Sequence, residues 1–265
     1  MVRKLVGKIF GNGLNIKIID MKKTLVLLIL FVSVAVSAQN FEYKWQRVKM
    51  DSTYEGNGTS DVEKLISKYS PELKPYMEIL AYSEAEMPKK GPESGLTNLA
   101  ADVILNTAKN FIKNDYPTLS LTNFGGIRVA FPKGAIRKYD VLSTFPFTNK
   151  IVVVQIKGKE IKKLLSRFAG RNKFEALGGV KIEVEDRKVT KCEIGGKPLK
   201  KNKVYNLATI DFVLGGGDKL NFKIVENSLL DTDVQLNDAV VAYLKELNEN
   251  KIVLSPKGDG RIIIK

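Results

Sequence analysis

Apolar residues recur along the chain with two different periods, which predict both helices and strands. Spacing of three and four residues, typical of one face of a helix, is clearest over residues 95–113, where the apolar face runs from Leu96 to Phe111. Short apolar runs bounded by glycine, proline or polar residues predict strands instead. The predicted helices cover residues 61–69 (capped by Ser60 or Asp61, and ended by Pro71), 95–113, 158–168 and 238–247. The predicted strands cover residues 79–82, 119–122, 151–156, 180–184, 189–194, 204–210 and 262–264.

The order of these elements favours an α+β fold. Helices and strands alternate irregularly, and the strands are joined both by tight turns, such as Gly195-Gly196, and by helices. The expected architecture is therefore a set of mixed β-sheets with packed helices. The part that follows the N-terminal region is long enough for one well-buried domain, expected over residues 39–265.

The N-terminal region has the layout of a secretory signal peptide. Met21-Lys22-Lys23 is charged, residues 24–36 are apolar, and small residues precede Gln39. We expect translation to start at Met21, with residues 1–20 an upstream extension, and cleavage near Ala38. The protein would then be periplasmic or secreted and would keep no stable membrane span. A membrane anchor that stays attached is the alternative.

The net charge, the single cysteine and the absence of histidine limit the classes of function expected for this chain. The formal charge is +14, and it falls to +9 when the six basic residues and one acidic residue of the first 38 positions are removed. Acidic residues are interspersed with the basic ones and no arginine–aromatic stripe is present, so a nucleic acid polymer is not expected as a partner. The single cysteine, Cys192, forms no intramolecular disulfide and lies in a strand-like run that favours burial. Histidine, the commonest general base and transition-metal ligand, is absent.

The first candidate binding segment is Thr122-Asn123-Phe124-Gly125-Gly126-Ile127-Arg128. Gly125 and Gly126 allow backbone N–H groups to approach a ligand, and Asn123 has both a donor and acceptors. Arg128 offers a planar fork suited to carboxylate or phosphate. The alternative is a glycine-rich turn in which Arg128 forms a surface ion pair.

Two further segments add aromatic rings and a carboxylate. Phe145-Pro146-Phe147-Thr148-Asn149 lies at a turn before a strand, and proline can direct one of its rings outward. Phe212 ends a strand, and Asp218 follows three glycines. Two rings from separate loops could enclose a base, while Asp218 accepts hydrogen bonds from ribose hydroxyls. The alternative is that the rings belong to the core.

With these motifs in their order, the chain resembles the C-terminal, substrate-binding domain of the 5'-nucleotidase family. Further matching motifs are Pro92 to Asp102, Gly178-Gly179, Gly196 to Leu199, Tyr205 and Asp259 to Ile262. The resemblance implies that Phe147 and Phe212 form the family's aromatic clamp, that Asp218 binds ribose, and that two loops supply the remaining ligand contacts. The substrate-binding residues implied are Asn123, Gly125, Gly126, Arg128, Phe147, Asn149, Phe212, Asp218 and, in place of an arginine, Lys90.

The sequence departs from the family pattern in four places and in one larger respect. Lys90 keeps a charge but loses the bidentate fork, and Phe124, Thr148 and Lys219 replace residues that are usually small or glycine. In the family, catalysis belongs to an N-terminal metallophosphoesterase domain with two metals, and no such domain is recognisable here. No catalytic residue, metal ligand or cofactor is therefore assigned to this chain, and two divalent metals are expected in a partner.

These observations predict a secreted nucleotide- or nucleoside-binding domain of a split 5'-nucleotidase. It would act with a separately encoded metallophosphoesterase in nucleotide catabolism, by hydrolysis of phosphoric esters. Two alternatives stay open: a non-catalytic nucleotide-binding protein, and a scaffold or interaction protein whose pocket has degenerated.

Overall fold

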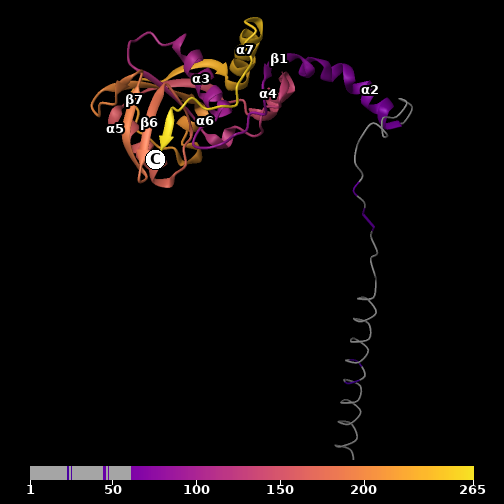
Figure 1. The fold of residues 1–265 in the computed structure, drawn as a ribbon, viewed down its shortest axis with the longest axis horizontal. Helices are drawn as coiled ribbons and strands as arrows, with labels where there is room; N and C mark the ends of the chain where they lie inside the picture. Colours follow the sequence, from indigo (N-terminus) through magenta and orange to yellow (C-terminus); the bar gives the residue numbers. More distant parts are fainter. Residues whose placement is uncertain (1–22, 24, 26–43, 46, 48–60) are drawn as a thin grey trace, which may run out of the picture. The chain divides into compact units, whose positions relative to one another are not determined.

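The structure is a computed structural model that describes residues 61–265, together with the isolated residues 23, 25, 44, 45 and 47 (Figure 1). Residues 61–265 form one compact unit. The predicted start at Met21, the signal peptide, its cleavage near Ala38 and the cap at Ser60 lie outside the described residues. No helix in the described part of the chain is both long and apolar enough to cross a bilayer.

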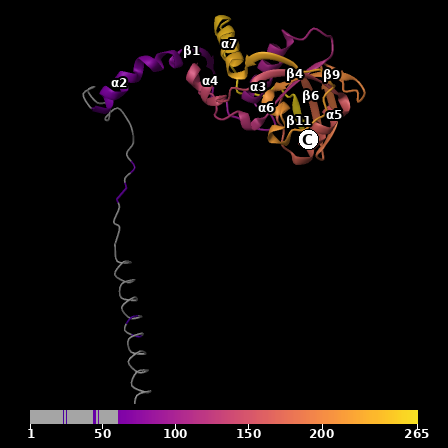
Figure 2. The same cartoon turned by 180° about the vertical axis from the view of Figure 1, so that it is seen from behind.

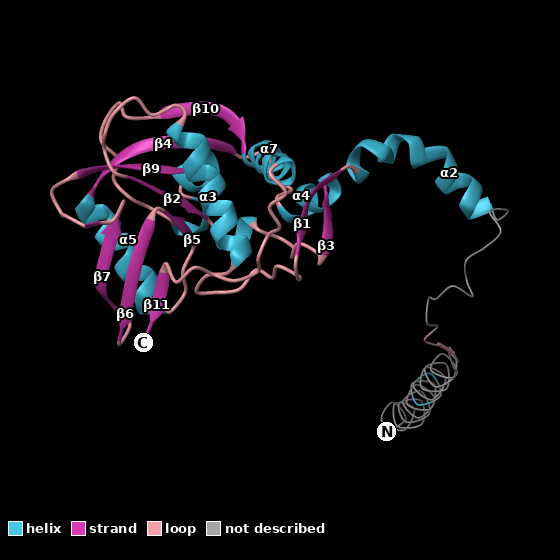
Figure 3. Ribbon diagram, turned by 45° about the horizontal axis from the view of Figure 1, so that its top comes forward, coloured by secondary structure: helices cyan, strands magenta, loops and turns pink. Residues whose placement is uncertain are grey.

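A five-stranded mixed sheet forms the centre of this unit, with strand order β10-β4-β9-β2-β5 (Figure 3). Strands β2 and β9 are parallel, whereas the other neighbours are antiparallel. Their sequences are nearly continuous apolar runs because β4, β9 and β2 are buried along almost their whole length. Helix α3 (Gly95–Lys109) packs across β5, β2, β4 and β9. The strands are β2 (Thr118–Thr122), β4 (Lys150–Lys157), β5 (Ala176–Gly178), β9 (Val204–Ile210) and β10 (Leu230–Gln235).

A four-stranded sheet with order β11-β6-β7-β8 lies against helix α5, which also packs on β4. Strand β6 alternates buried and exposed residues, so only one of its faces is covered. The β6–β7 hairpin turns at Asp186 and Arg187, both with positive φ, as a two-residue hairpin requires. These strands are β6 (Val180–Glu185), β7 (Lys188–Ile194), β8 (Lys197–Pro198) and β11 (Ile262–Ile264).

The remaining strands form a small antiparallel sheet beside helix α7 (Figures 1 and 2). It consists of β1 (Ile79–Ser83) and β3 (Gly134–Arg137). The α-helices are α2 (Asp61–Leu73), α3 (Gly95–Lys109), α4 (Lys138–Thr144), α5 (Gly158–Arg171), α6 (Asp211–Leu214) and α7 (Leu236–Glu249). The short 3-10 turns are η2 (Lys74–Met77), η3 (Phe124–Gly126) and η4 (Gly217–Lys219).

The α+β prediction is confirmed, and the helix ends that differ most from the predicted ones, by four residues each, are those of α2 and α3. Helix α3 ends at Lys109, and the chain turns back through N–H groups of Phe111 and Ile112 that donate to the Ala108 carbonyl. Helix α2 continues to Leu73 through Pro71. This proline costs little here because no residue of α2 is buried, so water can reach the carbonyl that Pro71 leaves unpaired.

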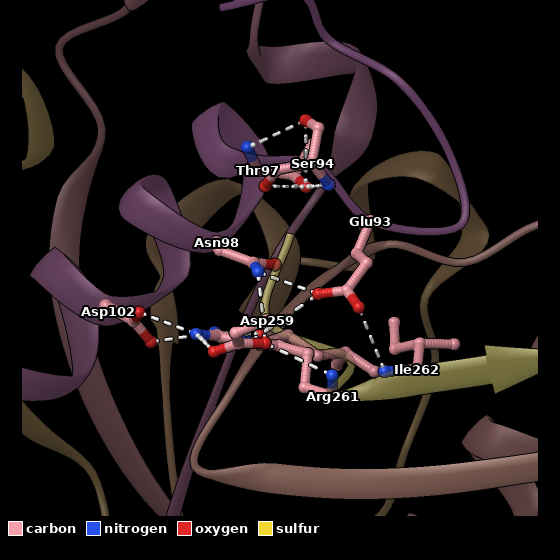
Figure 4. A network of polar contacts seen from close by, with 9 residues as sticks. Glu93, Ser94, Thr97, Asn98, Asp102, Asp259, Arg261 and Ile262 are labelled. Carbon is pink, nitrogen blue, oxygen red and sulfur yellow. Dashed lines mark hydrogen bonds and ion pairs between the residues drawn. The ribbon is translucent and has the colours of Figure 1, made fainter. Parts of the chain in front are cut away.

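A charged network ties the start of α3 to the last strand (Figure 4). Both terminal nitrogens of Arg261 donate hydrogen bonds to the carboxylate of Asp102 (2.8 and 2.7 Å), and Nη2 also donates to Asp259. Burial alone would lower the pKa of Arg261, but the hydrogen bonds to Asp102 and Asp259 outweigh it and raise the pKa. Glu93 accepts from Asn98 (2.7 Å), and Ser94 and Thr97 form a capping box. The motifs around residues 92–102 and 259–262 thus hold the fold together.

Candidate functional site

Three strand ends meet at one edge of the central sheet, which explains why the candidate loops converge. Because β2 and β9 are parallel, the segments that follow them leave the same edge: Asn123 after β2, and Phe212 after β9. Strand β4 is antiparallel to β9, with Ile151 opposite Ile210. Its start, just after Phe147 and Asn149, therefore lies at that edge too. Segments nearly ninety residues apart in sequence are brought together by strand pairing alone.

A pocket of about 190 Å³ lies between these segments. It is lined by eight of the nine residues that the sequence analysis selected: Asn123, Gly125, Gly126, Arg128, Phe147, Asn149, Phe212 and Asp218. The ninth, Lys90, does not line it, and its backbone N–H donates to Ser94 Oγ (3.4 Å). The ligand-binding role of all nine residues stays a prediction.

Within the described part of the chain, one buried polar atom of a residue that lines the pocket has no hydrogen-bond partner. Asn123 is 4% exposed, and its Nδ2 donates to Asp218 Oδ2 (2.7 Å). This bond fixes the orientation of the amide, since a flipped amide would place Oδ1 against the carboxylate. Oδ1 is then a buried acceptor without a hydrogen bond. Such an atom is costly unless a donor reaches it, and a ligand N–H or O–H would satisfy it.

The glycines are required by close approach. A Cβ on Gly126 would lie 2.8 Å from Asn123 Oδ1, and one on Gly125 would lie 3.3 Å from Asp218 Oδ2. In the second loop, a Cβ on Gly217 would overlap the Phe212 ring. The small residues therefore let both polar groups and the ring occupy their positions beside the pocket.

Two aromatic rings flank the pocket and stay accessible. Phe147 is 46% exposed and Phe212 is 45% exposed. Phe145, two residues before Phe147, is buried and meets Phe131 edge-on, with ring centroids 6.2 Å apart. The alternative that the rings belong to the core is thus right for Phe145 and wrong for the other two. Apolar rings exposed beside hydrogen-bonding side chains mark a surface that gains from a flat partner.

Arg128 lies beside the first ring. Its guanidinium carbon is 6.0 Å from the centroid of Phe147, and Nη1 donates to the Gly125 carbonyl (3.3 Å). No salt bridge of Arg128 is found in the described part of the chain, which disfavours the surface ion pair considered above. The cation is available for an anionic group of a ligand.

Sequence reasoning missed Glu175 and Arg167. Glu175 lies in the turn after α5, and its Oε2 accepts from the Phe124 backbone N–H (2.5 Å). Burial, reinforced by the charge of Asp218, raises the pKa of Glu175. Arg167 of α5 donates Nη2 to the Lys219 carbonyl (2.6 Å). Neither residue stands in a glycine motif, and only the tertiary fold brings them to the loops.

The residues that line the pocket offer hydrogen-bonding groups, charges and aromatic rings. Among the residues that the structure describes, no three histidine, cysteine, aspartate or glutamate side chains cluster as a metal site would require. Cys192 lies in β7 outside the pocket, and burial raises the pKa of its thiol to about 11, which keeps it protonated.

Comparison with known proteins gives one family. Residues 77–226 match the family described as 5'-nucleotidase, C-terminal domain. Protein UshA of Yersinia enterocolitica is 36% identical over 98 residues, which cover 36% of this chain and 18% of UshA. The trifunctional nucleotide phosphoesterase protein YfkN of Bacillus subtilis is 28% identical over 188 residues, covering 64% of this chain and 12% of YfkN. The chain thus matches less than a fifth of the length of either relative.

Solved structures agree on the fold. A 5'-nucleotidase precursor from Thermus thermophilus superposes with a TM-score of 0.63 and 24% identity, over 77% of this chain and 42% of the other. The NAD nucleotidase NadN of Haemophilus influenzae gives a TM-score of 0.57 and 18% identity, over 85% of this chain and 47% of its own. At these identities the similarity supports the architecture.

Proposed function

Because this chain belongs to the 5'-nucleotidase family through its C-terminal domain, we propose that it binds the nucleoside part of a nucleotide in the pocket at the edge of the central sheet. The observation that carries the proposal is the buried, unpartnered Oδ1 of Asn123, a residue that lines the pocket together with two accessible rings. A nucleoside offers what this pocket lacks: a flat base for the rings and N–H or O–H donors for the acceptor.

Each group in the pocket has a defined task in this proposal. Phe147 and Phe212 enclose the base, and Asp218 accepts hydrogen bonds from the ribose hydroxyls. Asn123 Oδ1 accepts from the base or sugar, while Arg128, Asn149 and Lys90 contact polar or phosphate oxygens. The pocket volume of about 190 Å³ is below the roughly 300 Å³ of a site that encloses a whole ligand. The phosphate would therefore project outward.

Replacing Asp218 with asparagine tests the ribose contact. Asp218→Asn keeps the shape of the side chain but removes the charge, so we expect ribonucleoside binding to weaken by about tenfold or more. A 2',3'-dideoxynucleoside, which cannot use this contact, should lose much less. Calorimetric titration of both ligands measures the difference, with Asp211→Asn as the control on the same loop. Equal losses for the two sugars would remove Asp218 from ribose recognition.

We further propose that the chain acts outside the cytoplasm with a separate metallophosphoesterase, as a split 5'-nucleotidase. The partner would supply two divalent metals that activate water and stabilise the charge on the transferred phosphoryl group. This chain would hold base and ribose, so that their binding energy positions the phosphate at the partner's metals. Phosphate release from AMP should then be faster with both proteins than with the metallophosphoesterase alone.

Helix α2 offers a surface for such a partner. Val62, Leu65, Ile66, Tyr69 and Leu73 lie on one side of the helix and are 47–66% exposed. An apolar stripe of this length on a helix with no buried residue is typical of a helix that another protein covers. The stripe ends four residues before the family match begins at residue 77. It therefore adjoins the domain that would have to be joined to a catalytic partner.

Placing a charge in the stripe tests this surface. We expect Leu65→Glu to abolish most of the gain in phosphate release, because a carboxylate in an apolar interface must lose its hydration. Ser67→Glu adds the same charge on the opposite side of the helix and should keep the gain. The assay measures phosphate released from AMP by a metallophosphoesterase of the same organism. Equal rates with and without this chain, while nucleosides still bind, would indicate a binding protein without a catalytic partner.

A further inference from the structure

We infer that Arg167 and Glu175 are positioning residues, which hold the two ligand loops in register from outside the pocket. The inference rests on the proposed function for its effect on affinity, since it concerns the loops that would bind the nucleoside. Both residues come from one stretch of chain: Arg167 from the last two turns of α5, and Glu175 from the turn that leads to β5. Neither lines the pocket.

Arg167 holds the second loop in a conformation that its residues would not choose. Asp218 and Lys219 both have left-handed backbones, with φ of 52° and 60°. Two consecutive residues with a Cβ in this region are unfavourable and persist only where neighbours fix them. The 2.6 Å hydrogen bond from Arg167 to the Lys219 carbonyl is such a restraint, at the residue next to the ribose-binding candidate.

Glu175 holds the first loop in the same manner. Its carboxylate accepts from the backbone N–H of Phe124, the first residue of η3. Phe124 stands between Asn123 and Gly125, which both line the pocket. A shift of the Phe124 amide would therefore move both neighbours relative to the ligand.

The hydrogen bonds of Asn123, Glu175 and Arg167 together form a closed path that joins the two loops and α5. Asn123 of the first loop donates to Asp218 of the second (2.7 Å), and Arg167 and Glu175 connect both loops to α5 and the turn after it. Glu175 is electrostatically coupled to the same groups. Burial raises its pKa and the hydrogen bond from Phe124 lowers it, while the charge of Asp218 raises it and those of Lys173 and Arg167 lower it. The position of one loop therefore depends on the position of the other.

Substitutions that separate charge from hydrogen bonding test the inference. Glu175→Ala removes the acceptor and Arg167→Met removes the donor, and each should weaken nucleoside binding by about tenfold, the effect of about one lost charge-assisted hydrogen bond. Glu175→Gln keeps an acceptor and Arg167→Lys keeps a donor, so both should restore most of the affinity. Glu185→Ala and Arg171→Met, at exposed sites outside this path, are the matched controls.

A second readout needs no ligand. In protein labelled with ¹⁵N-phenylalanine, the Phe124 amide should shift as Glu175 ionises, at a pH above the ordinary pKa of 4.5. Glu175→Gln should abolish this titration and Glu185→Ala should leave it intact. A Phe124 amide that is indifferent to Glu175, or a Glu175→Ala variant that binds as tightly as the wild type, would overturn the inference. If the amide titrates but the wild type binds no nucleoside, the proposed function fails while the restraint on the loop stands.

Discussion

Replacing Arg261 with methionine should lower the free energy of unfolding by about 2 kcal/mol, the cost of leaving the acceptors of this partly buried network without their charged donor. Arg261 is among the most enclosed charges of the described chain, and its side chain is 11% exposed. Methionine fills a similar length but leaves the carboxylates of Asp102, Asp259 and the nearby Glu93 without their cation. Because these carboxylates come from both ends of the domain, their repulsion would separate α3 from β11.

Denaturant unfolding measures this effect. Arg171→Met, at an exposed position near the end of α5, should change stability by no more than about 0.5 kcal/mol. The network also predicts an acid dependence. The hydrogen bond from Arg261 lowers the pKa of Asp259 below its ordinary 3.8, so this stabilisation is complete above a pH of about 3.8 and is lost as the pH falls through the lowered pKa. A wild type and an Arg261→Met variant of equal stability would contradict the account of the network.

Removing both aromatic rings should nearly abolish nucleoside binding. Stacking is worth about 1–3 kcal/mol per base, so each single substitution, Phe147→Ala or Phe212→Ala, should weaken binding by roughly 5- to 150-fold. The double variant should lose about a hundredfold or more, without exact additivity, because both rings contact the same base. Calorimetric titration with the preferred nucleoside provides the measurement.

The same variants should fold normally, which separates a binding effect from a folding effect. Nearly half of each ring is exposed, so its removal deletes little buried area. Phe111→Ala, at an exposed ring beyond the end of α3, is the matched control and should leave affinity unchanged. A double variant that binds like the wild type would show that the rings do not enclose the ligand.

The sequence predicts the three middle strands of the central sheet, β4, β9 and β2, because each carries its own signal. Each of these strands is a mainly apolar run with glycine, proline or asparagine beside it. Such a run predicts a buried strand without reference to the strands that pair with it. Strand β10 escapes prediction because its sequence, Leu-Asp-Thr-Asp-Val-Gln, is largely polar and becomes a strand by pairing with β4. Strands β3 and β5 and helix α4 are short and depend on tertiary contacts in the same way.

The residues of the candidate site also differ in whether the sequence predicts them. Glycine spacing and exposed rings indicate the residues that line the pocket, because close approach and stacking limit which residue types fit. Glu175 and Arg167 act through backbone groups of other residues, which any sequence supplies, so nothing in their own neighbourhood marks them. The motif residues Asp102, Asp259 and Arg261 are the reverse case, because the sequence selects them but they do not line the pocket. Asp102 lies inside the family match and Asp259 and Arg261 lie beyond it, and the contacts of all three are structural.

The most direct test of nucleoside binding is thermal unfolding of the whole protein against nucleosides, nucleotides and UDP-sugars, beside the Phe147→Ala/Phe212→Ala variant. A ligand present at one hundred times its Kd should stabilise the wild type by about 2.7 kcal/mol, and the variant should show no such shift at the same concentration. We expect this stabilisation from ligands that share one base. The account would be contradicted if no ligand on the panel raised the melting temperature of the wild type, or if the variant were stabilised equally.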